Sequence, residues 1–296
     1  MVLNGTREGL FNAVVALGQT GSKILIPNPF YQVYTVAAMA IGAQSVYLPA
    51  RAESGFLPDL DALTPEELNQ TSVFFLCSPS NPQGVVASEA YWTRLLTLAE
   101  TYDFKIFADE CYSEIYRTAP PPGALQVAAQ MGADPERVVA FHSLSKRSNL
   151  PGLRSGFLAS GSKNISRIKQ LRAYAGCPVA GPIQHVSAKV WSDEDHVVAN
   201  RQLYCGKFEV ADRIFAGIKS YNSPEAGFFL WLPVEDDEAT ALKLWAETGL
   251  RVLPGSYLGQ IANEQNPGSG YIRVALVAPK EEMQRGLTIL RDCLYK

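Results

Sequence analysis

The stretch RVVAFHSLSKRSNLPGLRSGFLAS covers residues 137–160 and indicates how the chain folds. Its first seven residues form a short apolar run and its last six, SGFLAS, form another, so each has the length and composition of a buried β-strand. Ser143 ends the first run, and Ser145 and Lys146 come directly after it. Open α/β sheets bind ligands beyond the carboxyl ends of their strands, so a lysine amine at this point could face a cleft.

The same alternation extends from this stretch back to Lys23. Short apolar runs (KILIPN, SVYLPA, SVFFLC and FKIFADE) alternate with helical stretches such as AYWTRLLTLAETY and ALQVAAQM. We therefore expect an α/β fold with a mostly parallel sheet and helices on both faces. Upstream, a helix is expected to begin at Thr6 and to stop at Gly21.

A second, smaller α+β unit is expected after the sheet. The pattern is mainly helical from about Gly181 through Ile218, and then AGFFLWLPV, a helix around ATALKLWAET, LRVLPGS, YIRVALV and a last helix follow. We place a large domain at residues 1–208 and a small C-terminal domain at residues 209–296, with a loop at residues 220–224 after a long helix that joins them.

Composition favours an enzyme that acts on a small molecule. The 296 residues are 47% apolar and 19% charged, with a net charge of -3 and no basic stripe, so neither nucleic acid nor an anionic membrane is an expected partner. No stretch of about 18 apolar residues and no signal-like N-terminus occurs. Five scattered cysteines without a C-x-x-C pair indicate neither a disulfide framework nor a metal site. We expect a cytoplasmic protein.

Two strand ends carry groups suited to catalysis, and each has a plainer interpretation. Asp109 follows Ile106-Phe107-Ala108, with Tyr112 three residues on, but an aspartate at such a junction is often a helix cap. Lys146 follows the strand RVVAFHS, yet most lysines are exposed and solvated. Arg154 is interesting mainly for its spacing from Lys146.

Other segments offer ligand-binding groups with similar alternatives. The helix that begins near Gly5, Thr6 and Arg7 presents free backbone N–H groups and the positive end of a helix dipole, which together suit an anion. Asn81 lies in the turn-forming stretch SPSNPQG, and Tyr31, a candidate for core packing, follows the strand KILIPN. An arginine inside the apolar strand YIRVALV, Arg273, requires an anion, which an acidic side chain could also supply.

Taken in order, these segments resemble the class I/II aminotransferases, enzymes of fold type I that depend on pyridoxal 5′-phosphate (PLP). The resemblance covers nearly the whole chain and rests on NGTREGL, PNPFYQVY, SPSNPQG, ADECYSEIY, SLSKRSNLPGLRSGF, EAGFFLWL, VLPGSY and YIRVALV. It implies a fold-type I large domain, a smaller C-terminal α+β domain, PLP as cofactor, and an amino acid and a 2-oxo acid as substrates.

The resemblance also implies a role for each candidate residue. Lys146 would hold PLP as a Schiff base and then move a proton between the substrate Cα and the cofactor C4′. Asp109 would keep the pyridine nitrogen protonated, and Asn81 and Tyr112 would hydrogen-bond the phenolate oxygen. Tyr31 would stack on the cofactor ring, and Arg273 would bind the substrate carboxylate, with Asn81 as a second substrate-binding residue. The residues that would bind the phosphate are Gly5, Thr6, Arg7, Ser143, Ser145 and Arg154.

Within the family, FYQVY, DECYSEIY and HSLSKRSNLPGLRSGF are most similar to bacterial N-succinyldiaminopimelate aminotransferases, which act in lysine biosynthesis with 2-oxoglutarate as acceptor. Members usually form homodimers with the active site at the interface. They also carry a substantial segment before the glycine of NGTREGL, whereas four residues precede it here.

Three alternatives follow from the same residues. The scaffold could catalyse another PLP reaction, such as a β-elimination or transamination of a different amino acid. It could also be a catalytically idle fragment, although both Lys146 and Asp109 are present. A nucleotide-dependent dehydrogenase is set aside because no G-x-G-x-x-G follows a first strand.

Overall fold

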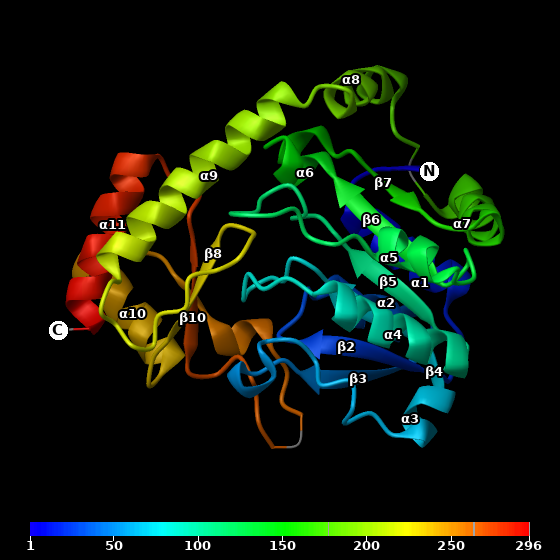
Figure 1. The fold of residues 1–296 in the computed structure, drawn as a ribbon, viewed down its shortest axis with the longest axis horizontal. Coiled ribbons are helices and arrows are strands. Elements are labelled where there is room, and N and C mark those ends of the chain that lie inside the picture. The colour runs from blue at the N-terminus through cyan, green and yellow to red at the C-terminus, as the bar shows by residue number, and fades with distance from the viewer. Residues whose placement is uncertain (177, 263, 296) are drawn as a thin grey trace.

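Apolar runs of five to seven residues form the centre of the large sheet, as their composition predicts (Figure 1). The computed structural model describes residues 1–176, 178–262 and 264–295. Seven strands form this sheet in the order β1-β7-β6-β5-β4-β2-β3. Their bounds are β1 Val2–Leu3, β2 Lys23–Asn28, β3 Gln44–Pro49, β4 Thr71–Cys77, β5 Lys105–Asp109, β6 Val138–Ser143 and β7 Gly156–Ala159.

The sheet is mostly parallel, which confirms the fold class expected from the alternation of strands and helices. All neighbours from β3 to β6 pair in parallel, whereas β7 is antiparallel to both β6 and β1. The connection from β6 to β7 holds only α6 (Leu144–Arg147) and the 3₁₀ turn η2 (Pro151–Leu153). Since neither is long enough to cross the sheet, the chain returns beside β6 in the opposite direction.

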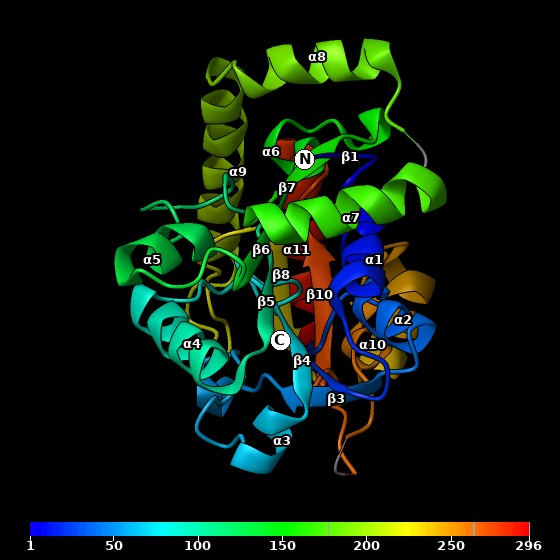
Figure 2. The same ribbon diagram turned by 90° about the vertical axis from the view of Figure 1, so that its right-hand side faces the viewer.

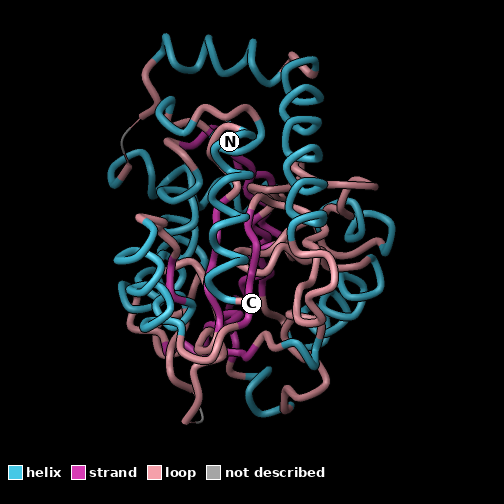
Figure 3. Tube along the Cα trace, turned by 90° about the vertical axis from the view of Figure 1, so that its left-hand side faces the viewer, coloured by secondary structure: helices cyan, strands magenta, loops and turns pink. Residues whose placement is uncertain are grey.

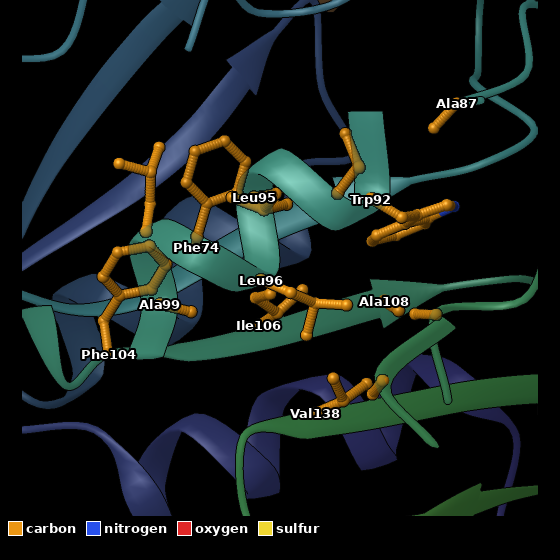
Figure 4. Packing of buried hydrophobic residues seen from close by; sticks show 14 of the residues in the cluster. Phe74, Ala87, Trp92, Leu95, Leu96, Ala99, Phe104, Ile106, Ala108 and Val138 are labelled. Atoms are coloured by element: carbon orange, nitrogen blue, oxygen red, sulfur yellow. The ribbon is translucent and has the colours of Figure 1, made fainter. Parts of the chain in front are cut away.

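Helices cover both faces of the large sheet (Figure 2). Along β4, Phe74 and Leu76 pack against one group of helices, while Val73 and Phe75 pack against the other, as the two-residue period of a strand requires. Figure 4 shows the first of these two cores between helix and strand. One face carries α1 (Thr6–Leu17), α2 (Val33–Ala40) and α7 (Ser162–Ala175), and the other carries α4 (Glu89–Tyr102) and α5 (Ala124–Met131), with α3 (Pro65–Asn69) beside α4.

The first helix is shorter than expected. It ends at Leu17, because Gly18 takes an extended conformation (φ -69°, ψ 166°) while its N–H still donates to the carbonyl oxygen of Val14. A Cβ at Gly18 would lie 2.6 Å from Cδ1 of Ile41, so this position has no room for a side chain. The prediction of a stop at Gly21 was wrong, and Gly21 instead has φ +76° in the turn before β2.

The C-terminal part forms a second layer of helices around a three-stranded antiparallel sheet in the order β8-β10-β9. In Figure 3 the last helix lies in front of the strands. The predicted boundary between residues 208 and 209 falls inside α9 and stays a prediction. The bounds are α8 Gly181–Trp191, α9 Asp195–Ile214, β8 Phe229–Pro233, α10 Asp237–Thr248, β9 Leu253–Pro254, β10 Tyr271–Ala275 and α11 Lys280–Leu294, with 3₁₀ turns η1 Ala52–Ser54 and η3 Gly255–Leu258.

Two further observations concern membrane-spanning helices and cysteines. None of the helices in the described ranges is both long and apolar enough to cross a membrane. Cys77, Cys111, Cys205 and Cys293 are free thiols, and Cys177 lies outside the described residues.

Candidate active site

A cavity of about 620 Å³ lies beyond the carboxyl ends of the parallel strands and is lined from both sheets. In Figure 1 the arrowheads of β2 and β3 point toward the smaller sheet. The cavity volume lies within the usual range for a small-molecule site, about 300–1,000 Å³. Nearly all the predicted site residues line it: Thr6, Arg7, Tyr31, Asn81, Asp109, Tyr112, Ser143, Ser145, Lys146, Arg154 and Arg273.

Asp109 lines this cavity from the last position of β5. Its side chain is only 5% exposed, and burial raises the pKa of its carboxyl group. The Tyr34 hydroxyl donates to Oδ2 at 2.8 Å and opposes that rise, because a hydrogen bond to the charged form favours it. Asp109 does not cap a helix, since residues 111–114 after β5 form turns. A buried carboxylate of this kind is best stabilised by a cationic N–H group.

Lys146 enters the cavity from α6. This short helix begins at Ser143, whose hydroxyl accepts from the backbone N–H of Ser145 at 3.1 Å. The Lys146 amine lies 5.1 Å from the ring centroid of Phe228. Burial lowers the pKa of Lys146, and the nearby guanidinium groups of Arg273 and Arg154 lower it further, whereas Cys111 acts in the opposite direction. The lysine is therefore a more available nucleophile than an exposed one.

The start of α1 lies beside Arg154, and the two together have the positive charge and free N–H groups that suit an anion. Gly5 precedes the helix with φ +79°, and within the described chain no side chain caps this end. A Cβ at Gly5 would approach Cζ of Arg154 to 2.8 Å, so the absence of a side chain lets the guanidinium lie against the helix start. Gly5 itself is buried behind Arg154 and is the one predicted site residue that does not line the cavity.

Asn81 and Arg273 come together from the two sheets, 192 positions apart in sequence. Arg273 Nη1 donates to Asn81 Oδ1 at 2.9 Å, and the guanidinium lies 4.4 Å from the Phe229 ring centroid. The alternative that an acidic side chain supplies the anion for Arg273 is wrong, because within the described residues no carboxylate pairs with it. Tyr112 packs edge-on against Phe228 and Phe229, and burial raises its pKa.

Tyr31 and Arg7 also line the cavity, and their side chains contact each other. Arg7 Nε donates to the Tyr31 hydroxyl at 2.5 Å. The turn that carries Tyr31 is tied to the C-terminal part, because the Phe30 N–H donates to the Leu258 carbonyl oxygen at 3.0 Å. The Asn28 amide donates to the Gln260 carbonyl oxygen at 2.8 Å, which strengthens the same connection.

Sequence reasoning missed Tyr34, the direct partner of Asp109. It is 1% exposed and stacks on Phe75 with ring centroids 4.2 Å apart. The spacing in FYQVY was the available signal, since Tyr34 lies one helical turn after Tyr31 at the start of α2. Cys77 and Cys111 were also missed as lining residues; burial raises the pKa of both thiols.

The comparisons with known proteins agree with this geometry. The model of the family described as aminotransferase class I and II matches residues 1–290. The chain belongs to the class I and II aminotransferases. The expected enzyme class is therefore confirmed, and the family to which the chain belongs depends on PLP.

Individual aminotransferases resemble the whole chain. It is 29% identical to the LL-diaminopimelate aminotransferase of Syntrophobacter fumaroxidans, covering 100% of this chain and 75% of that protein. A solved aminotransferase from Neisseria meningitidis has a TM-score of 0.94 and 38% identity, with 99% of this chain and 76% of that one covered. A probable N-succinyldiaminopimelate aminotransferase from Thermus thermophilus has a TM-score of 0.89 and 27% identity, covering 99% and 77%.

Substituting Gly5 tests the anion site of this aminotransferase. We expect Gly5→Ala to weaken PLP binding by about 10-fold or more, because the new Cβ displaces Arg154 and costs that anion a charge-assisted hydrogen bond. The Gly5 backbone (φ +79°, ψ 157°) lies in a region essentially restricted to glycine, which adds strain of about 1–3 kcal/mol. Equilibrium dialysis of PLP measures the effect, with Gly132→Ala, at a distant positive-φ helix end, as the control for strain alone. Equal losses in both variants would contradict the assignment.

Substituting Arg273 tests the electrostatics around Lys146. Since the Arg273 cation lowers the pKa of the lysine, Arg273→Met is expected to raise it. Covalent attachment of PLP requires the neutral amine, so its midpoint should move to higher pH. The measurement is the rate of attachment against pH, followed by visible absorption. Arg251→Met is the control, because Arg251 lies on Trp245 outside the cavity. A midpoint that stays in place would show that Arg273 does not act on Lys146.

Proposed function

We propose that this chain transfers the amino group of N-succinyl-LL-2,6-diaminopimelate to 2-oxoglutarate, as a PLP-dependent aminotransferase of lysine biosynthesis. The observation that carries the proposal is the convergence, in one cavity, of a buried carboxylate, a lysine amine of lowered pKa and an arginine without an acidic partner among the described residues. These are the groups that amino-acid chemistry on PLP needs.

The residues fit PLP. The uncapped start of α1, together with Arg154, suits a phosphate dianion, and the buried Asp109 carboxylate suits a protonated ring nitrogen. When bound, PLP acts as an electron sink for the bonds at the amino-acid Cα. We assign Ser143 and Ser145 to the phosphate end, Tyr31 to one ring face, and Asn81 and Tyr112 to the phenolate oxygen.

The chain's own groups then act in sequence. Arg273 binds the substrate α-carboxylate through its planar fork, and its bond to Asn81 holds that fork in place. Lys146 would hold the cofactor covalently, and its free amine would take up and return the proton of the substrate Cα. Its lowered pKa keeps a larger share of the amine neutral and able to accept a proton near neutral pH.

The charge of the cavity favours the succinylated donor over free LL-diaminopimelate. Among the described lining residues, Asp109 is the only carboxylate, whereas Arg7, Lys146, Arg154 and Arg273 are cationic. Free diaminopimelate carries a second ammonium group at its far end, and no lining carboxylate is available for it. Succinylation replaces that ammonium by a neutral amide and adds a carboxylate, which matches the cationic lining.

A homodimer and a cytoplasmic location are part of this proposal. Family resemblance supports the dimer, and so does apolar surface on α8 and α9. Of α8 only Ser187 is buried, and Leu203 on α9 is 68% exposed. Figures 2 and 3 both show α8 at the margin of the molecule. The division into domains at residues 208 and 209 also remains a proposal.

A donor screen tests the function. The purified protein is mixed with PLP and 2-oxoglutarate, and glutamate formation is compared for N-succinyl-LL-diaminopimelate, LL-diaminopimelate and aromatic or aliphatic amino acids. We expect the highest kcat/KM with the succinylated donor. A higher value with free LL-diaminopimelate overturns the donor assignment, and release of ammonia and pyruvate without an acceptor indicates a β-lyase. Borohydride reduction followed by peptide mapping checks attachment at Lys146.

A further inference from the structure

Asn200 is a half-buried polar residue on α9 that the proposed function leaves without a role. Its amide Nδ2 donates to the carbonyl oxygen of Lys146 at 3.3 Å and to that of Arg147 at 3.4 Å. These two residues end α6, and the last carbonyl groups of a helix have no partner within the helix itself. Asn200 therefore supplies, from α9, bonds that the end of this one-turn helix lacks. Figures 1 and 2 both show α6 beside α9.

Tyr204, one helical turn after Asn200, acts at the other end of the same lysine. Residues four apart lie on one face of a helix. Tyr204 stacks on Phe228 with ring centroids 5.6 Å apart, and the Lys146 amine lies 5.1 Å from the centroid of the Phe228 ring. The α9 helix thus bonds to the backbone of Lys146 through Asn200 and packs against the ring that its amine contacts.

The same helix holds the segment that carries Tyr112. Arg201 Nε donates to the Glu114 carbonyl oxygen at 2.9 Å, and Nη2 donates to Oε2 of that residue at 2.8 Å. One turn later, the Cys205 thiol donates to the Tyr116 carbonyl oxygen at 3.5 Å. Since α9 is bonded both to the turn after β5 and to the helix after β6, it fixes the position of these two segments relative to each other.

A separate set of contacts holds α6 from the side of α8. Arg147 is 5% exposed, its Nη1 donates to the Val190 carbonyl oxygen at 3.2 Å, and its Cζ lies 4.9 Å from the Trp191 ring centroid. Loss of the Asn200 bonds should therefore let the end of α6 shift without unfolding it.

We propose that Asn200 is a positioning residue that keeps the Lys146 amine in the cavity by fixing the end of α6. The inference rests on the proposed function, which gives Lys146 its role, and goes beyond it. A lysine amine sits on a flexible four-carbon stem, so its place depends on where the backbone is held. A misplacement of about 1 Å at a reacting group can cost about 100-fold in rate, and Asn200 prevents such a displacement.

The reactivity of Lys146 in the cofactor-free protein tests this assignment. Labelling with acetic anhydride over a range of pH, followed by peptide mapping, measures the rate at which the neutral amine reacts. Asn200→Leu removes the donor and adds no charge. Because burial lowers the pKa of Lys146, an amine released toward solvent should be labelled with a midpoint at higher pH. At neutral pH we expect its labelling to slow by about 3- to 10-fold, the equivalent of one hydrogen bond.

The half-reaction of glutamate with the PLP-loaded protein gives a second readout. In Asn200→Leu its rate at saturating glutamate should fall by about 10-fold, because the proton-transferring amine is displaced. The half-saturating glutamate concentration should stay the same, since Arg273 and its bond to Asn81 are unaltered. An effect on stability alone would change neither the labelling midpoint nor the rate of the folded protein.

Two further variants complete the test. Asn200→Ala removes the same donor without adding bulk and should give the same shift, and Tm measurements check that each variant folds. Gln202→Leu is the matched control, because Gln202 is an exposed amide on the same helix. An unchanged midpoint in the folded Asn200 variants overturns the assignment, and so does an equal shift in Gln202→Leu. If the unaltered protein does not attach PLP at Lys146, the proposed function fails, whereas the labelling comparison still decides whether Asn200 positions the amine.

Discussion

Lys146→Ala is expected to abolish the borohydride-reducible link to PLP and to lower kcat by about 10⁴-fold or more, because one amine both attaches the cofactor and moves the proton of the substrate. The substitution leaves the proposed phosphate site at α1 and Arg154 unaltered, so PLP is expected to bind still, without a covalent bond. Visible absorption, reduction and peptide mapping give the first readout, and single-turnover transamination gives the second.

The matched control is Lys189→Ala, which removes an exposed lysine on α8 that does not line the cavity. It should retain both the link and the activity. Transamination by Lys146→Ala at more than a few per cent of the normal rate would mean that another group moves the proton. Failure of the unaltered protein to label at Lys146 would favour the idle-fragment alternative.

Asp109→Asn is expected to lower kcat by about 10²- to 10³-fold, the cost of removing one preorganised charge from a buried site. An amide cannot keep a ring nitrogen protonated, while it preserves the volume and one acceptor for Tyr34. The change should be measured in single turnovers at saturating PLP, so that weaker cofactor binding does not enter the rate. Asp61→Asn is the control, since Asp61 forms only an exposed ion pair with Arg94.

The same substitution should stabilise the protein when it is free of cofactor. Burial raises the pKa of Asp109 above that of the unfolded chain. The folded state therefore holds this proton more tightly, and stability falls as pH rises from the ordinary carboxyl pKa through the raised one. The amide introduced by the substitution cannot ionise, so the Tm of Asp109→Asn at neutral pH should exceed that of the parent. A lower Tm would contradict this electrostatic account.

Much of the fold was predictable from the sequence because strand burial leaves a local pattern. The runs KILIPN, SVFFLC and RVVAFHS all became strands of the large sheet, with bounds within one residue of those expected. Their alternating faces pack against helices that the periodicity also indicated. The exceptions were local. The two-residue strand β1 has too few residues to form a pattern, and α1 ends at Leu17 because Gly18 takes an extended conformation.

Motif spacing also indicated eleven of the residues that line the cavity, since Asp109 ends β5 and Lys146 follows β6, two strands that end at the same edge of the sheet. Their roles were implied by resemblance and remain to be tested. By itself, therefore, the sequence determined the α/β fold class, the strand ends and the chemical groups that the strand ends carry.

Only the tertiary structure decided which of these groups meet. The bond from Arg273 to Asn81 joins β10 to the turn after β4, and those from Tyr34 to Asp109 and from Arg7 to Tyr31 join residues 75 and 24 positions apart. Such pairs depend on how helices and sheets pack, and no local pattern in the chain specifies that packing. The pKa shifts of Asp109 and Lys146 have the same origin, because burial and neighbouring charge are properties of the folded molecule.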